Sequence, residues 1–253
     1  MHPISITISI VSFGHNHFVS ELLKFNAGFI PKNITVVITD LLKQKIFEEE
    51  INSLGLPNLI YHTNQETFGY GKNNNIVFQA YAQKSDMFVV CNPDVEFDFS
   101  AFNTFVDNIN WQNHLLTCRT EIPGGLKNNN IRRFFNPVIW MGSFLKILNF
   151  DYWYYGSQRH EEVSFDWCSG AFMVFDSKAF QKLNGFDEGY FMYIEDTDIC
   201  YRCEKLKIGK KYYPTFAIKH FGQRQSKYVF NKHFRWIVQS VFRYYWKIYT
   251  NKM

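Results

Sequence analysis

The stretch WCSGAFMVFDSKAFQKLNGFDEGYFMYIEDTDICYRCEKLKIGKKYYPTFAIKHFGQRQS, residues 167–226, decides how this chain is interpreted. At its centre an aromatic and apolar run, 191–194, leads into Glu195, Asp196 and Asp198, which begin a helical pattern that ends at Gly209. A carboxylate partly sheltered by aromatic side chains can serve as a base near neutral pH. Acidic residues in a first helical turn also cap free amides. The spacing alone therefore leaves a catalytic and a capping interpretation open.

The segments on either side alternate between strand and helix patterns. The apolar run 172–175 predicts a strand, 177–183 predicts a helix, and 211–214 and 216–220 predict two more strands. The small residues 169–171 precede the first of these strands, where they let a ligand approach the backbone.

The N-terminal part begins with the same alternation. Isoleucines alternate with serine and threonine over 4–11, a helical pattern follows through 18–25, and a second strand over 34–39 ends at Asp40. Because ligands bind at the carboxyl ends of strands in open α/β sheets, Ser12, Phe13 and Asp40 share an edge where a nucleobase could bind. Asp40 could equally cap the next helix, which is expected near Leu41.

A glycine-containing segment follows a third predicted strand, 58–62. Gly69 and Gly71 let the backbone approach a ligand and open a helix whose first amides could face phosphate. The spacing matches neither a P-loop nor a dinucleotide fingerprint. The alternative is an ordinary loop before an asparagine-rich helix start.

The continuous apolar run 87–91 predicts a central buried strand. It ends at Asn92, Pro93 and Asp94, and a carboxylate at such a strand tip is placed to hold Mg²⁺ or Mn²⁺ against a diphosphate. The alternative is that Asn-Pro-Asp forms only a turn.

The ordered set of features in the C-terminal half resembles one known family. It comprises Ser169-Gly170-Ala171, Gly185-Phe186-Asp187, Glu195-Asp196, Asp198, Arg202, Pro214 and His220. This set resembles the family 2 inverting glycosyltransferases of the GT-A fold, and among them the rhamnosyltransferase-like members that build bacterial surface polysaccharides. The resemblance implies an α/β fold with an open, mostly parallel sheet flanked by helices and a C-terminal helical segment. It also implies transfer of a sugar, from dTDP-rhamnose or a UDP-sugar, to a hydroxyl of a saccharide or lipid-linked acceptor.

The resemblance also implies roles for individual residues. Asp196 would be the base, with Glu195 beside it. The nucleotide-sugar residues would be Ser12, Phe13, Asp40, Asn64, Gly69, Asn75, Asn92 and Asp94. The sugar-binding residues would be Trp167, Ser169, Gly170 and Ala171, and the metal ligands Asp94 and His220. The chain departs from the family pattern in two places: extra residues separate Asn64 from Gly69, and Asn92 replaces the first Asp of the D-x-D motif.

Composition narrows the cellular setting. The formal net charge of +4 over 253 residues does not imply a nucleic-acid partner. Five scattered cysteines suit reduced thiols in a cytoplasm, and the C-x-x-C at Cys200 and Cys203 lies in a helical pattern where packing is expected. No signal peptide or membrane-spanning run is expected, so the predicted location is cytoplasmic. The abundant aromatic residues predict that some lie on a binding surface.

Two segments lack a clear place in the sheet. The stretch 121–166 carries arginines and aromatic residues, which favour a role over the acceptor site. The tail 227–253 is basic, aromatic and free of acidic residues, so it predicts an amphipathic helix that lies on an anionic inner membrane surface or packs on the domain. The predicted division is a domain over 1–226, with a nucleotide-sugar half (1–119) and an acceptor half (120–226), and a helix over 227–253.

Two other classes remain open at this stage. A degenerate, non-catalytic nucleotide- or carbohydrate-binding module could follow from Asn92, if its amide has removed metal binding. A nucleotidyltransferase also places acids on an α/β nucleotide domain, but it should release pyrophosphate rather than a nucleoside diphosphate.

Overall fold

The computed structural model describes residues 3–123, 130–134, 162–222 and 232–250. The first half of the chain repeats strand and helix as the alternation predicted. Its elements are β1 (Ile6–Ser12), α1 (Asn16–Phe25), β2 (Ile34–Asp40), α2 (Lys45–Ser53), β3 (Leu59–His62), α3 (Tyr70–Val77), the π-helical turn η1 (Phe78–Ala82) and β4 (Met87–Cys91). Strand β1 pairs in parallel with both β2 and β4, and β2 pairs in parallel with β3. The helix expected near Leu41 begins only at Lys45.

The second half completes the sheet with strands of both directions. Its elements are β5 (Val95–Glu96), α4 (Phe99–Asp107), β6 (His114–Glu121), β7 (Ile131–Arg132), β8 (Trp167–Cys168), β9 (Phe172–Asp176), α6 (Ser177–Lys182), α7 (Glu195–Lys205), β10 (Gly209–His220) and α8 (Lys232–Thr250). Within the described residues, the main sheet has the order β3-β2-β1-β4-β9-β6-β10-β5. Strand β9 is antiparallel to β4 and β6, and β5 is antiparallel to β10, while the other pairs are parallel. The prediction of an open, mostly parallel sheet is confirmed.

One strand differs from its prediction. The two strands expected over 211–214 and 216–220 form a single strand, β10, with a register shift between Tyr213 and Ala217. Pro214 lies in this interval. Proline has no amide hydrogen to donate to the neighbouring strand. The strand therefore continues through Pro214 with a bulge and does not break there.

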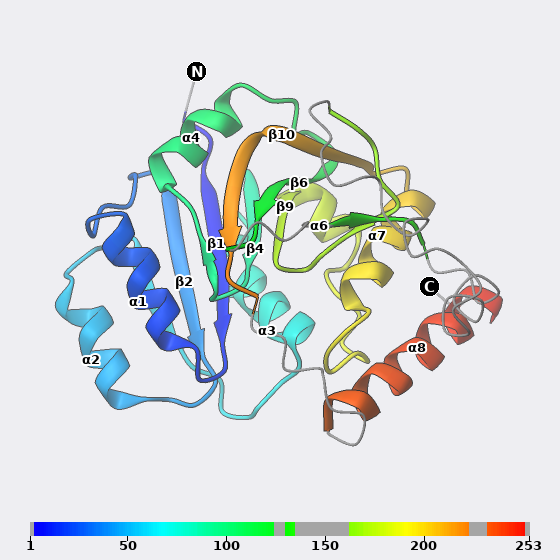
Figure 1. Ribbon diagram of the computed structural model, residues 1–253, viewed down its shortest axis with the longest axis horizontal. Coiled ribbons are helices and arrows are strands. Elements are labelled where there is room, and N and C mark those ends of the chain that lie inside the picture. Colours follow the sequence, from blue (N-terminus) through cyan, green and yellow to red (C-terminus); the bar gives the residue numbers. More distant parts are fainter. Residues whose placement is uncertain (1–2, 124–129, 135–161, 223–231, 251–253) are drawn as a thin grey trace.

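Helices cover both faces of the sheet, and each face has its own apolar cluster (Figure 1). On one face α1, α2 and α4 pack against the alternating isoleucines of β1. On the other face α3, η1, α6 and α7 pack together with Phe88 and Phe175. Many of the aromatic residues lie in these two cores, while Phe13, Phe191 and several aromatic residues of α8 are exposed. Cys200 and Cys203 are buried on α7, which confirms the packing interpretation of the C-x-x-C.

Gly69, the residue before α3, and Gly71, in its first turn, serve a close approach different from the one expected. A Cβ atom on Gly69 would lie 2.4 Å from the carbonyl oxygen of Phe191, and one on Gly71 would lie 2.7 Å from Cβ of Phe186. The Tyr70 amide donates to that Phe191 carbonyl at 2.9 Å. The absence of side chains at these two glycines therefore lets α3 pack closely against the 186–191 segment. This packing explains why glycine occupies both positions.

Helix α8 lies at the opposite end of the molecule from α1 and α2 (Figure 1). One side of it is packed on the domain, where Tyr244 and Ser240 are buried. Arg243 and Lys247 form ion pairs with Asp187, and Lys247 also pairs with Asp198. Among the residues described, no helix has the length and apolar character needed to cross a bilayer.

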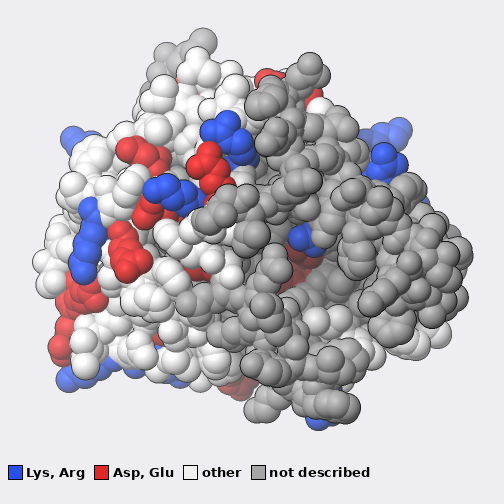
Figure 2. Space-filling view, viewed as in Figure 1, with Lys and Arg blue, Asp and Glu red and all other residues white. Residues whose placement is uncertain are grey.

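On the face seen in Figure 2, the described acidic and basic side chains are intermixed over the part that holds α1 and α2. Mixing of the two signs gives no extended basic stripe on that described part of this face.

Candidate active site

The site lies where β4 and β9 meet. Cys91 at the end of β4 pairs with Phe172 at the start of β9, and the Asn92 amide donates to the Ala171 carbonyl at 2.8 Å. One residue earlier, the Gly170 amide donates to a carboxylate oxygen of Asp196 at 3.0 Å. The small-residue turn thus joins Asn92 to Asp196, a contact that the sequence did not indicate. Because β1, β2, β4 and β10 all run in the same direction, their carboxyl ends share this edge of the sheet.

Asp196 and Glu195 occupy different environments although they are neighbours. Asp196 is partly exposed, and its second carboxylate oxygen accepts the Thr197 amide at 2.7 Å. Burial raises the pKa of Asp196, while the Gly170 and Thr197 donors and the charge of Arg132 oppose that rise. Glu195 is buried, and its Oε2 has no hydrogen-bond partner among the described residues. Burial, and then the charge of Asp196, raise the pKa of Glu195 to about 8.

A strained turn presents these two carboxylates. Tyr193 and Ile194 both adopt the left-handed region, with φ of 71° and 69°. Such a conformation costs on the order of 1–3 kcal/mol for a residue with a side chain and is concentrated at functional sites. The turn lets α7 begin directly at Glu195, so neither acid is a conventional N-cap. Ile194 holds that position and provides no side-chain cap.

The predicted metal ligands lie together. His220, at the end of β10, places Nε2 3.3 Å from a carboxylate oxygen of Asp94. The Phe221 amide also donates to the Asp94 carbonyl at 3.0 Å, and both side chains are mostly buried. A carboxylate and an imidazole that converge in this way fit a divalent cation that takes its remaining ligands from phosphate or water. Among the described residues, no group of three or more His, Cys, Asp or Glu side chains is arranged to hold a metal.

Asp40 and Ser12 make the contacts of local capping. Asp40 is fully buried, and its carboxylate accepts the amides of Leu42 and Gln44 at 3.0 and 2.8 Å. It also accepts from the Tyr61 hydroxyl and from the Asn16 amide. Ser12 donates to Asn16 at 2.5 Å. These contacts are those of the capping alternative for Asp40, while Phe13, 56% exposed at the same edge, remains available for stacking.

The other predicted nucleotide-sugar residues divide into two groups. Asn64 donates to Asn73 at 2.6 Å and so braces the turn before α3. Asn75 lies away from that turn, because its amide group bonds both the N–H and the carbonyl of Phe186. In this structure its contacts hold the 186–188 loop against α3.

Trp167 does not present its ring to a sugar. The side chain is 5% exposed, its indole N–H donates to the Arg133 carbonyl at 2.7 Å, and the Arg132 guanidinium lies 4.8 Å from the ring centroid. Ser169, Gly170 and Ala171 do lie at the site, beside Asp196. Most of the long segment predicted to cover the acceptor, 124–129 and 135–161, lies outside the described residues.

Tyr70 and Arg132 belong to the site, although the sequence did not single out Tyr70 and placed Arg132 only within the stretch expected over the acceptor site. The half-buried Tyr70 donates its hydroxyl to the Gly170 carbonyl at 2.9 Å, on the same residue whose amide holds Asp196. Arg132 lies close enough to Asp196 to favour its ionised form. The position of Tyr70 next to Gly69 was the one available signal for it.

Comparison with known proteins decides the family. The model of the glycosyltransferase-like family 2 matches residues 3–239. The chain belongs to this family. It is 29% identical to the rhamnosyltransferase WbbL of Escherichia coli (strain K12), over 94% of this chain and 92% of that protein.

Solved structures of glycosyltransferases share the fold at low identity. GalNAc-T7 with UDP, GalNAc and Mn²⁺ superimposes with a TM-score of 0.65 at 12% identity, over 95% of this chain and 48% of that one. The mannosyltransferase PcManGT from Pyrobaculum calidifontis, with GDP-Man and Mn²⁺, gives 0.61 at 12% identity, over 89% and 59%. S. aureus TarS 1-349 with UDP-GlcNAc gives 0.60 at 13% identity, over 89% and 62%. This chain therefore spans about half to three fifths of those solved proteins, and the fold is of the GT-A type.

The raised pKa of Glu195 predicts a pH-dependent stability. Its ordinary pKa is 4.5 and its folded pKa is about 8, so between these values the folded chain binds more protons than the unfolded chain. The free energy of unfolding should then fall as pH rises through this window, by up to about 1.4 kcal/mol per pH unit from this one group. Glu195→Gln should flatten that slope in urea unfolding measured at a series of pH values. The exposed Glu21→Gln on α1 is the control, and equal slopes for the two variants would contradict the assignment.

Proposed function

We propose that the protein transfers a sugar, rhamnose from dTDP-rhamnose or a sugar from a UDP-sugar, to a hydroxyl of a saccharide or lipid-linked saccharide with inversion. The pathway would be bacterial cell-surface polysaccharide biosynthesis, such as O-antigen, capsule or lipooligosaccharide. The observation that carries the proposal is the Asp196 carboxylate, held by the Gly170 amide beside the strand ends that bear Asn92 and Asp94. The similarity to a rhamnosyltransferase over most of both chains supports the choice of donor.

Asp196 acts in this proposal as the general base. The acceptor oxygen attacks the anomeric carbon, its proton passes to the Asp196 carboxylate, and the bond from that carbon to the nucleoside diphosphate breaks on the opposite face. Glu195 is the protonated neighbour, because its pKa of about 8 keeps it mostly neutral at pH 7. Burial raises the pKa of both acids, but the Gly170 and Thr197 amides oppose that rise at Asp196, so the two neighbours can hold different protonation states. Asp196, as the more exposed of the two and the one bonded by amides, is the group that reaches the acceptor.

Asp94 and His220 would hold a divalent cation, Mg²⁺ or Mn²⁺. Such an ion, when bound, neutralises charge on a leaving diphosphate. Asp94 supplies one anionic ligand oxygen and His220 fixes its orientation from β10, so the pair would position the diphosphate relative to Asp196. The presence of Mn²⁺ with UDP and GalNAc in GalNAc-T7, and with GDP-Man in PcManGT, supports this role.

The exposed side of α8 supports attachment to a membrane surface. Val238, Phe242, Trp246 and Tyr249 are half or more exposed and recur at helical spacing on one face. Aromatic side chains on an amphipathic helix insert at the boundary between headgroups and acyl chains. Arg243 and Lys247, two of the basic residues expected to meet lipid, are engaged with Asp187 instead, so the apolar face carries most of this proposal. Attachment would keep the enzyme on the cytoplasmic face, near a lipid-linked acceptor.

The base assignment predicts the effect of removing one carboxylate. Asp196→Asn should lower the transfer rate by roughly 10²–10⁴-fold, because a general base contributes about that much. Donor affinity, measured by calorimetry, should stay close to that of the unmodified protein. Asp107→Asn, an exposed change at the end of α4, is the matched control. Near-normal transfer by Asp196→Asn would move the role to Glu195 or Asp198.

The metal assignment predicts a loss on chelation. Excess chelator should abolish transfer, and added Mn²⁺ should restore it, because Asp94 and His220 cannot by themselves neutralise a diphosphate. Asp94→Asn should weaken the Mn²⁺-dependent part of donor binding, measured as the difference in thermal shift with and without Mn²⁺. Full activity in chelator would contradict the assignment.

The membrane assignment predicts sedimentation with vesicles. The protein should sediment more with anionic than with neutral liposomes, and this difference should shrink at high salt because the surface potential is screened. Replacing Phe242 and Trp246 by Ser should weaken binding about tenfold or more, since each buried aromatic contributes about 1.5–3 kcal/mol at full burial. Gln239→Ser, exposed on the same helix, is the control. Unchanged sedimentation of the double variant would show that α8 serves only domain packing.

A further inference from the structure

The segment that carries the catalytic carboxylates is held from outside by α8. Between Asp187 and Asp198 the chain passes through Tyr193 and Ile194, the two residues in the left-handed region, and then into Glu195 and Asp196. Two left-handed residues in succession persist only where surrounding contacts fix them. The part of the chain that supplies those contacts therefore determines how rigidly the Asp196 carboxylate is positioned.

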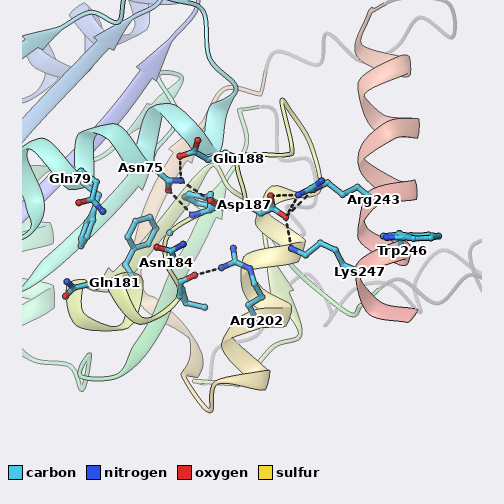
Figure 3. Close-up of a pocket in the computed structure, with 15 residues that line it drawn as sticks. Asn75, Gln79, Gln181, Asn184, Asp187, Glu188, Arg202, Arg243, Trp246 and Lys247 are labelled. Carbon is cyan, nitrogen blue, oxygen red and sulfur yellow. Dashed lines mark hydrogen bonds and ion pairs between the residues drawn. The ribbon is translucent and has the colours of Figure 1, made fainter. Parts of the chain in front are cut away.

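The contacts at the two ends of this segment are ionic and come from α8. Lys247 lies 2.7 Å from an Asp187 oxygen and 2.5 Å from an Asp198 oxygen, and it is the one described cation that bridges both. Arg243 adds a 2.7 Å contact to Asp187, and these two cations lower the pKa of Asp187 to about 2 against the opposing effect of burial. Asp198 is almost fully buried and also pairs with Arg202 at 2.7 Å. Figure 3 shows Arg243 and Lys247 reaching from α8 toward Asp187.

The middle of the segment also contacts α8. The Ser240 hydroxyl donates to the Met192 carbonyl at 3.0 Å, and the Phe191 and Trp236 rings lie 4.7 Å apart. A Cβ atom on Gly189 would lie 2.1 Å from Cζ of Arg243, so the guanidinium rests directly on that backbone. Helix α8 thus follows the segment along its length.

Apolar packing does not fill the space beside the ion pairs. A cavity of about 860 Å³ lies between α6, the 184–188 loop and α8, and its lining includes Arg202, Arg243 and Lys247 (Figure 3). Where an interface is not filled by side chains, its geometry depends on the polar contacts that cross it. Of the two α8 cations that cross here, Lys247 is the more sheltered, with 13% of its side chain exposed against 43% for Arg243.

We propose that α8 is a part of the transfer site and that Lys247 is a positioning residue, which fixes the turn carrying Glu195 and Asp196 by bridging Asp187 and Asp198. This inference rests on the proposed function for its effect on catalysis, but its structural content stands on the contacts alone. It also gives α8 two roles, positioning of the acidic segment and contact with a membrane surface, because the face of α8 opposite Lys247 is the exposed apolar face.

The test compares Lys247→Met and Lys247→Arg in the full chain, with Lys205→Met as the control. Lys205 is an exposed cation in the last turn of α7, so its loss removes the same charge without touching the segment. Hydrogen exchange should accelerate over 187–198 in Lys247→Met and leave α1 unchanged, with Lys247→Arg intermediate. In the same variants kcat should fall roughly 10- to 100-fold while the KM for donor stays within about twofold, because a misplaced base affects the chemical step. Partial recovery of kcat in Lys247→Arg is expected.

Two results would overturn the proposal. One is unchanged exchange over 187–198 in Lys247→Met, and the other is faster exchange with kcat equal to that of Lys205→Met. If the unmodified protein transfers no sugar from any donor, the proposed function has failed. The exchange measurement then still decides whether Lys247 holds the segment.

Discussion

The hydrogen bond from the Gly170 amide to the Asp196 carboxylate is the contact on which the site depends. It joins the turn before β9, which is bonded to the end of β4 through Asn92, to the first turn of α7. A charged acceptor makes this bond stronger than one between neutral groups. Gly170 also accepts the Tyr70 hydroxyl, so three parts of the chain that are far apart in sequence meet at one residue. Asp196, the end of β4 and the start of α3 owe their common location to this junction.

The acidic residues that follow the aromatic run have separate tasks, set by what surrounds each one. Glu195 is buried without a donor on Oε2 and is held neutral, whereas Asp196 has amide donors on both oxygens. Asp198, three residues further along the same helix, forms ion pairs with Arg202 and Lys247. Removing one partner from a buried pair leaves an uncompensated charge, which costs far more than a surface pair contributes. The chemistry and the support of the site are therefore divided among neighbouring residues of one helix turn.

Family membership identifies the chain as a glycosyltransferase. Other features are particular to this chain. Asn92 stands where the family carries an acid, and it contributes its backbone amide to the junction with Ala171. Asp94 and His220 remain as a converging pair. Helix α8 adds cations that hold the acidic segment and exposes aromatic side chains on its other side. One helix thus contacts both the reacting end of the molecule and its surroundings.

The sequence by itself determined most of the order of strands and helices and the sheet class, because periodicity is a local property of the chain. It also paired Asp94 with His220, through the family resemblance. The contact between the 169–171 turn and Asp196 was decided only by the tertiary structure. Only the tertiary structure decided that Asp40 caps a loop, that Asn75 braces Phe186 and that Trp167 is buried, since each depends on neighbours distant in sequence. The same holds for Gly69, whose missing side chain admits the Phe191 backbone rather than a ligand. The sequence did not indicate the ion-pair partners of Arg243 and Lys247. A helix face with basic residues has the same sequence pattern whether it contacts lipid or a carboxylate from another part of the chain.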